Sequence, residues 1–122
     1  MTICRIWRGW TTRENAGAYE AIVRGEVIPE IERRGIPGFL SIDLIRRPVE
    51  EGFEFATIMW FDDLDSVKAF VGDDYEVAHV PERARAALSG FDERSAHYEV
   101  IDRRVQPTVG GQGTPTPDNT AT

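Results

Sequence analysis

The sequence contains two histidines, whose side chains have the ordinary pKa closest to neutral pH, and His79 is the stronger candidate for chemistry. Tyr75 precedes it by four residues, which is one helical turn. An imidazole that accepts a proton and a phenol that donates one can therefore share a pocket. Two structural roles stay open. A histidine beside Val80 and Pro81 can cap a helix end by hydrogen-bonding a backbone carbonyl, and a tyrosine can anchor a loop.

Trp60 is the second candidate, because a buried indole N–H needs a hydrogen-bond partner and such rings either form core or wall a ligand pocket. Side chains alternate along a strand, so Ala56 and Ile58 lie on the same face as Trp60. If this face meets the helices, we expect all three residues to line a cavity between sheet and helices. The small side chain of Ala56 would enlarge that cavity.

Arg5 and Trp7 form a third group, two residues apart on an expected strand and therefore on one face. An arginine beside an aromatic pocket can hold an anionic substrate, although it can also stack on the ring in a purely structural role. Phe70, which follows Trp60 on an expected helix, completes the set of pocket residues. For His97 we expect a structural or dimer-contact role.

Composition argues against several classes of function. A formal net charge of −7 disfavours nucleic acids and anionic membranes as partners, because both are bound by clustered Lys and Arg. The two histidines are not at ligand spacing and Cys4 is the single cysteine, so no metal site is expected. No phosphate-binding loop or dinucleotide fingerprint follows an expected strand.

The same features bear on localisation. A lone Cys4 suggests a reducing compartment, and Met1 leads directly into an expected strand without an apolar signal segment. No apolar run approaches the roughly 20 residues that a membrane helix requires. We therefore expect a cytoplasmic protein that does not contact a membrane.

Four strands are expected to carry these residues. Alternation of apolar and polar residues predicts strands over residues 2–10, 39–47 and 96–102. The run 53–61 is β-branched and aromatic with one charge, which indicates a central strand covered on both faces. The short segment 48–52 predicts a hairpin between the second and third strands.

Two main helices are expected between the strands. Thr11 or Thr12 caps the first, whose apolar stripe recurs at three- and four-residue steps up to residue 31, and Pro29 predicts a kink or break. Asp62 is the expected cap of the second helix, which Gly72 ends. A short third helix over residues 82–88 follows Pro81.

The resulting order of strand, helix, strand, strand, helix, strand predicts an α+β, ferredoxin-like βαββαβ fold with a four-stranded antiparallel sheet. Helices then cover one face only. The other face is too apolar for water, so we expect a homodimer in which two sheets form a shared α/β barrel. Residues 1–102 form this domain. Residues 103–122 are polar and rich in Pro, Gly and Thr, and a disordered tail is expected.

Three motifs give the chain a resemblance to the antibiotic biosynthesis monooxygenase family of dimeric α/β-barrel proteins. They are an aromatic first strand running into Thr-Thr-x-x-Asn; Ile-Pro-Gly-Phe over 36–39; and Thr-Ile-Met-Trp over 57–60 before a helix with Ala-Phe at 69–70. The resemblance covers residues 2–102. It implies the dimeric barrel fold, within which several chemistries occur.

The cofactor-free branch of that family implies a monooxygenase that uses O₂ on an electron-rich, polyketide-like aromatic molecule. Trp60 matches that branch's strand Trp, Ala56 and Ser66 stand where it has Asn and Tyr, and His79 falls within a residue of its Arg. The resemblance thus implies roles for His79 and Trp60 without a cofactor, and Tyr75, placed by its spacing from His79, completes the expected catalytic set. His79 would be the base or the partner of an oxyanion.

Two alternatives accompany this interpretation. The family's haem-degrading branch implies haem with His79 as the axial ligand, while Phe70 replaces its Trp. A dimeric small-molecule-binding module without catalysis is the other alternative, in which Trp60 and Phe70 are simply core.

Overall fold

The computed structural model describes residues 1–108, and residues 109–122, which hold most of the expected tail, lie outside the described part. The sheet is built from β1 (Ile3–Thr11), β2 (Phe39–Val49), β3 (Gly52–Phe61), β4 (Gly90–Phe91) and β5 (Ala96–Glu99). The helices are α1 (Arg13–Ile22), the π-helix η1 (Val23–Val27), α2 (Ile28–Arg33), α3 (Leu64–Val71) and α4 (Glu82–Ala86).

The sheet is antiparallel, with β3 and β1 in the interior and β2 at one edge. Both β4 and β5 pair with the remaining side of β1, so two short pieces fill the fourth strand position. This confirms the α+β, ferredoxin-like fold and the central position of the third strand. The last strand expected over residues 96–102 is present as β5 but ends at Glu99, and β4 is an additional short strand. Between β4 and β5, residues 93 and 95 bond to the backbone of residues 78 and 76 in the loop before α4.

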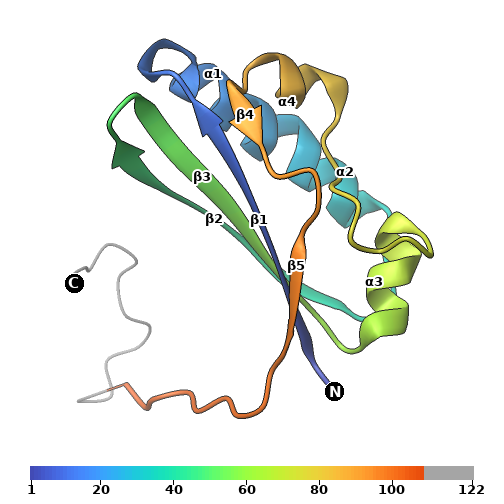
Figure 1. Ribbon diagram of the computed structural model, residues 1–122. Helices are drawn as coiled ribbons and strands as arrows, with labels where there is room; N and C mark the ends of the chain where they lie inside the picture. Colours follow the sequence, from blue (N-terminus) through green and yellow to red (C-terminus); the bar gives the residue numbers. More distant parts are fainter. Residues whose placement is uncertain (109–122) are drawn as a thin grey trace.

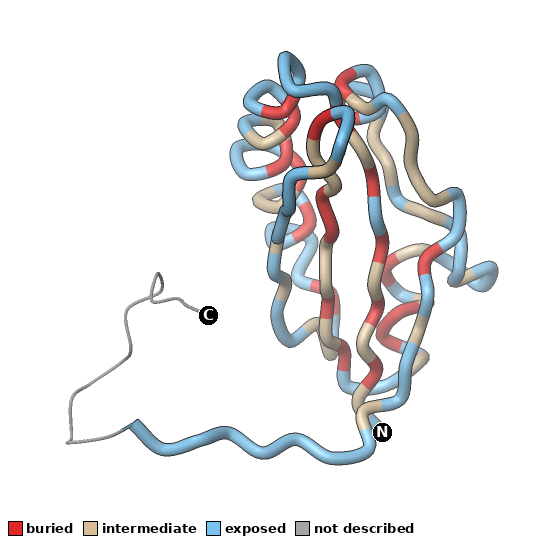
Figure 2. Tube along the Cα trace, turned by 60° about the vertical axis from the view of Figure 1, so that its left-hand side comes forward, coloured by how far each residue is buried: buried red, intermediate tan, exposed pale blue. Residues whose placement is uncertain are grey.

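The helices lie on one side of the sheet, and the other side is left uncovered (Figure 1). Buried and partly exposed residues alternate along the interior strands (Figure 2). Phe55 and Phe61 are at most 1% exposed and face the helices, where Phe55 meets Tyr19 edge to face at 4.8 Å. The expectation that the face of Trp60 meets the helices is therefore wrong, because the larger buried rings occupy that side.

Of the kink or break expected at Pro29, the break is absent: the helical segment runs from residue 13 to 33 and contains the π-helix η1 just before the proline. Pro29 has no N–H and its ring would press on the carbonyl four residues earlier. The chain widens into η1 just before the proline, and the Ile28 N–H donates to the Val23 carbonyl in an i to i−5 bond. The π-helix η1 thus accommodates Pro29 within a continuous helical segment.

The helix caps follow local side-chain chemistry. Thr12 caps α1 by accepting from the Asn15 N–H, as expected. Asp63, not Asp62, caps α3: its carboxylate accepts from both the backbone N–H and the hydroxyl of Ser66, each at 2.9 Å. The expected cap is one residue early, because the N–H of Asp62 still donates to the Gly38 carbonyl as the strand ends.

Gly38 is expected to tolerate no side chain. Its φ of +81° favours glycine, and a Cβ would lie only 2.8 Å from the Cβ of Ser66. We expect Gly38→Ala to lower the free energy of unfolding by about 2 kcal/mol, measured by urea denaturation. Gly17→Ala is the matched control, because nothing lies within 4 Å of that helical position. Equal stability of the two variants would contradict this prediction.

Within residues 1–108, no helix combines the length and apolarity needed to cross a bilayer.

Candidate active site

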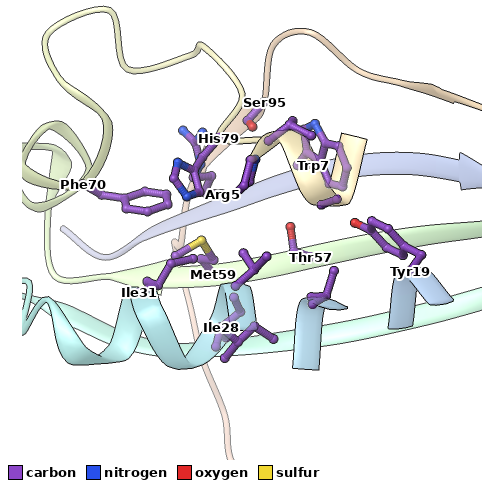
Figure 3. Close-up of a pocket in the computed structure, with 16 residues that line it drawn as sticks. Arg5, Trp7, Tyr19, Ile28, Ile31, Thr57, Met59, Phe70, His79 and Ser95 are labelled. Atoms are coloured by element: carbon purple, nitrogen blue, oxygen red, sulfur yellow. The ribbon is translucent and has the colours of Figure 1, made fainter. Parts of the chain in front are cut away.

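A cavity lies between the helix-covered face of the sheet and the helices (Figure 3), and among its lining residues His79 is exposed, which places the mouth of the cavity there. Its interior volume is about 40 Å³, and the empty space including the mouth is about 510 Å³. The walls are mostly apolar and aromatic. The lining residues are Arg5, Trp7, Tyr19, Val23, Val27, Ile28, Ile31, Ile42, Thr57, Met59, Phe70, His79, Val80, Pro81, Ala84 and Ser95.

Arg5 is the central charge of this cavity and is only 3% exposed. It lies on β1 between Met59 of β3 and His97 of β5. Its guanidinium donates to the carbonyls of Tyr75 and Val77 at 2.6 and 2.9 Å and to His97 Nε2 at 2.9 Å. None of these partners is a carboxylate. Burial lowers the pKa of Arg5 to about 10, so the group stays cationic near neutral pH.

His79 lies in the loop between α3 and α4, at the mouth of the cavity. The residue is exposed on its outer side, while its ring packs on Phe70 with 5.1 Å between ring centroids. Burial of the ring lowers the pKa of His79, and the cations of Arg34 and Arg5 lower it further, against an opposing effect of Glu30. The imidazole is therefore neutral at pH 7 and able to accept a proton.

The charge that lines the cavity is positive, whereas the net charge of the whole chain is negative. The net charge of the protein is −7, yet no Asp or Glu is among the residues that line the cavity in the described part of the chain. Arg5 and Arg34 both lie over the Phe70 ring, at 5.5 and 5.3 Å. A cavity with cations and without carboxylates favours anionic groups on a ligand.

Three polar residues that line the cavity were not predicted as site residues from the sequence: Tyr19, Thr57 and Ser95. The hydroxyls of Tyr19 and Thr57 point toward one another across the cavity (Figure 3). Ser95 is 4% exposed, and its hydroxyl has no hydrogen-bond partner among the described residues. Tyr19 was visible only as part of an apolar helix stripe. Ser95 lies in the segment between β4 and β5, and no pattern of polar and apolar residues predicts its position.

The structure brings four of the expected pocket residues together: Arg5, Trp7, Phe70 and His79 line the cavity. Tyr75 does not line it. Its ring packs edge to face on His97 at 5.1 Å, and its carbonyl accepts from Arg5. Tyr75 therefore holds Arg5 in place, which differs from the expected role of proton donor in the cavity.

Trp60, Ala56 and Ile58 are separated from His79 by the sheet. In the register with β1 they pair with Cys4, Arg8 and Ile6, whereas the cavity-lining Met59 and Thr57 pair with Arg5 and Trp7. The expected pocket of Trp60, Ala56 and Ile58 with His79 is therefore wrong. The guanidinium of Arg103 lies 5.9 Å from the Trp60 ring on the uncovered face.

The cavity holds no set of metal ligands. Within residues 1–108, no three residues of the types His, Cys, Asp and Glu come together in a group that could bind an ion.

No protein-family model matches the chain, and no curated protein matches it by sequence. Solved structures do match. A candidate antibiotic biosynthesis monooxygenase from Bacillus cereus has a TM-score of 0.61 at 14% identity, over 88% of this chain and 99% of that one. A candidate antibiotic biosynthesis monooxygenase from Caulobacter crescentus has a TM-score of 0.58 at 18% identity, over 83% and 91%.

A monooxygenase from the gene ActVA-Orf6 of Streptomyces coelicolor, solved with nanaomycin D, matches with a TM-score of 0.51 at 15% identity, over 88% and 92%. At these identities the likeness concerns the fold. The chain thus has the fold of the antibiotic biosynthesis monooxygenases, as its motifs imply. That fold hosts several chemistries, so the fold alone does not define the function and the residues of the cavity must.

Proposed function

We propose that this protein is a cofactor-independent monooxygenase that acts on an electron-rich aromatic small molecule. One observation carries the proposal: a neutral imidazole, His79, lies at the mouth of an aromatic-lined cavity beside the buried cation of Arg5. A base next to a fixed positive charge is what deprotonation of an acidic phenol or anthrone requires.

The reaction follows from these two groups. His79 removes a proton from the bound substrate, and the positive charge of Arg5 stabilises the resulting anion. The resulting anion transfers an electron to O₂, and the radical pair combines to a hydroperoxide. Loss of water leaves a carbonyl, so a CH₂ group and O₂ become C=O and H₂O. Trp7 and Phe70 supply the apolar walls.

The size of the cavity supports a small substrate. The empty space of about 510 Å³ includes open solvent at the mouth, so the enclosed interior sets the limit on what can be buried. The interior of about 40 Å³ is well below the roughly 150 Å³ of a cavity that encloses benzene. We therefore propose a substrate with a single ring, which lies partly in the mouth and inserts one edge into the interior. This is narrower than the polyketide-like class that the family resemblance implies.

Haem, the alternative that the family resemblance raises, does not fit this cavity. His79 is the available axial ligand, but its ring is packed on Phe70. The interior beside it is smaller than a single benzene ring needs, and a porphyrin needs several times more. No haem step is proposed.

Oxygen consumption tests the proposal. We expect the purified protein, without added metal or reductant, to consume O₂ when dithranol, a commercial anthrone, or 2,6-dimethoxyphenol, a single-ring phenol whose free para carbon can become C=O, is supplied. The rate must exceed that of spontaneous autoxidation and scale with protein concentration. Rates equal to the protein-free control with both substrates would reject the oxygenase and favour the non-catalytic binding module.

We further propose that the protein is a cytoplasmic homodimer joined through the uncovered sheet face. That face presents Ile6, Ile58 and Trp60, which are half-buried in the single chain, and the exposed Ile45 and Tyr98. An apolar sheet face of this kind is typical of a buried interface. Trp60, Ala56 and Ile58 then act in assembly, which accounts for their distance from His79.

Sedimentation velocity tests the dimer. We expect a dimer at micromolar concentration and a monomer for Ile58→Asp, because a carboxylate at the centre of the face would be buried unpaired. Ala21→Asp, on the exposed side of α1, is the matched control and should leave the dimer intact. A monomeric parent protein would refute the proposed interface.

A further inference from the structure

Arg5 and Ser95 form the polar end of the cavity, and not all of their hydrogen-bonding groups have a partner among the described residues. The three bonds of Arg5 to Tyr75, Val77 and His97 occupy at most three of the five N–H groups of a guanidinium. Ser95 lines the same cavity with a hydroxyl that has no partner among the described residues, although 96% of the residue's surface is buried. Buried hydroxyls without a partner are rare and costly.

The charge at this end is also uncompensated. The partners of Arg5 are two backbone carbonyls and an imidazole nitrogen, and no carboxylate lines the cavity in the described part of the chain. A buried cation without a counter-charge is unfavourable, and a ligand that brings a negative charge removes that cost. Arg5 and His79 both lie against the Phe70 ring, at 5.5 and 5.1 Å, and Ser95 lines the same cavity (Figure 3).

We propose that this end of the cavity is a carboxylate-binding subsite, in which Arg5 and Ser95 hold the acid group of an apolar, single-ring carboxylic acid. A carboxylate has two oxygens that accept several hydrogen bonds, which matches a planar guanidinium edge together with a hydroxyl. A phenolate has one oxygen and matches this set less well. The apolar body of the ligand would lie along Trp7, Phe70 and Met59.

This inference rests on the proposed function only for the location of the ligand, since binding of an acid needs no oxygen chemistry. The test is therefore calorimetry in the absence of O₂, with 3-phenylpropionate and its uncharged isostere 3-phenylpropionamide. We expect the acid to bind at least about tenfold more tightly than the amide, because hydrogen bonds to charged groups are the stronger ones. Equal affinities, or no binding of either compound at millimolar concentration, would overturn the subsite.

Ser95→Ala is the decisive variant, because Arg5 variants disturb the loop that Arg5 holds. We expect Ser95→Ala to weaken binding of the acid by about tenfold and to leave binding of the amide unchanged. Ser41→Ala, on the exposed opposite face, is the matched control and should bind both compounds like the parent. An equal loss for acid and amide in Ser95→Ala would mean a purely structural role and would overturn the assignment.

Three further outcomes separate the alternatives. Tighter binding of 4-nitrophenolate than of 3-phenylpropionate would overturn the carboxylate class in favour of a phenolate. Binding of the acid without any oxygen consumption would support the subsite and reject the oxygenase. Oxygen consumption with neutral aromatic compounds, together with equal binding of the acid and the amide, would support the oxygenase and reject the carboxylate subsite.

Discussion

Replacement of His79 by alanine is expected to lower protein-dependent oxygen uptake by about 10²–10⁴-fold, the usual contribution of a general base. His79 is the neutral imidazole at the cavity mouth, and no carboxylate among the described lining residues could replace it. His79 is an exposed residue, so the proton it takes can pass to solvent. Oxygen-electrode rates at saturating substrate measure the effect.

The pH profile provides an independent check on His79. The base must be neutral, and burial together with Arg34 and Arg5 places the pKa of His79 below its ordinary value of about 6.5. Activity should therefore rise with pH through this lowered pKa and reach a plateau above pH 6.5. Glu30 is the carboxylate that raises the pKa of His79, so Glu30→Gln should shift the rising limb to lower pH.

Two results would contradict this role of His79. A His79→Ala variant with the parent rate would remove His79 from the mechanism. A Glu30→Gln variant whose pH profile matches that of the parent would show that another group titrates. Trp60→Phe is the matched aromatic control, because Trp60 lies across the sheet from the cavity, and it should keep the parent rate.

Replacement of Arg5 by methionine is expected to lower the free energy of unfolding by about 2–4 kcal/mol, because the carbonyls of Tyr75 and Val77 lose the donor of two part-buried, charge-assisted hydrogen bonds. Methionine keeps most of the apolar stem, so the loss reports on the guanidinium. The loop over residues 73–81, which carries His79, should also lose its fixed position. Urea denaturation measures the stability, and hydrogen exchange of the loop amides measures the second effect.

Arg8→Met is the control for Arg5, since both residues lie on β1. Arg8 is half exposed and pairs with Asp92 at 3.0 Å, a surface ion pair that contributes at most about 1 kcal/mol. We expect Arg8→Met to change stability by at most about half of the Arg5 effect. Equal losses in the two variants would show that the buried hydrogen bonds of Arg5 do not hold the loop.

The sequence by itself determined the elements and their order, because these depend on short-range properties. Period-two alternation and β-branched residues predicted the strand at residues 53–61, and the Thr12 cap predicted the start of the first helix. The hairpin and the order of elements then leave few ways to form a sheet. His79, Arg5, Trp7 and Phe70 were also identified, since an arginine or histidine among aromatic residues stands out by type.

Only the tertiary structure decided which side of the sheet carries the cavity. Alternation separates Trp60 from Met59 but is symmetric between the two faces, and packing of Phe55 against Tyr19 breaks that symmetry. The partners of Arg5 lie 70 to 92 residues away in the chain, at Tyr75, Val77 and His97, so no local pattern reveals them. Ser95 also reaches the cavity through contacts that are distant in the chain. Backbone hydrogen bonds to the 76–78 loop hold the segment between β4 and β5, and the Ser95 hydroxyl of that segment faces the cavity.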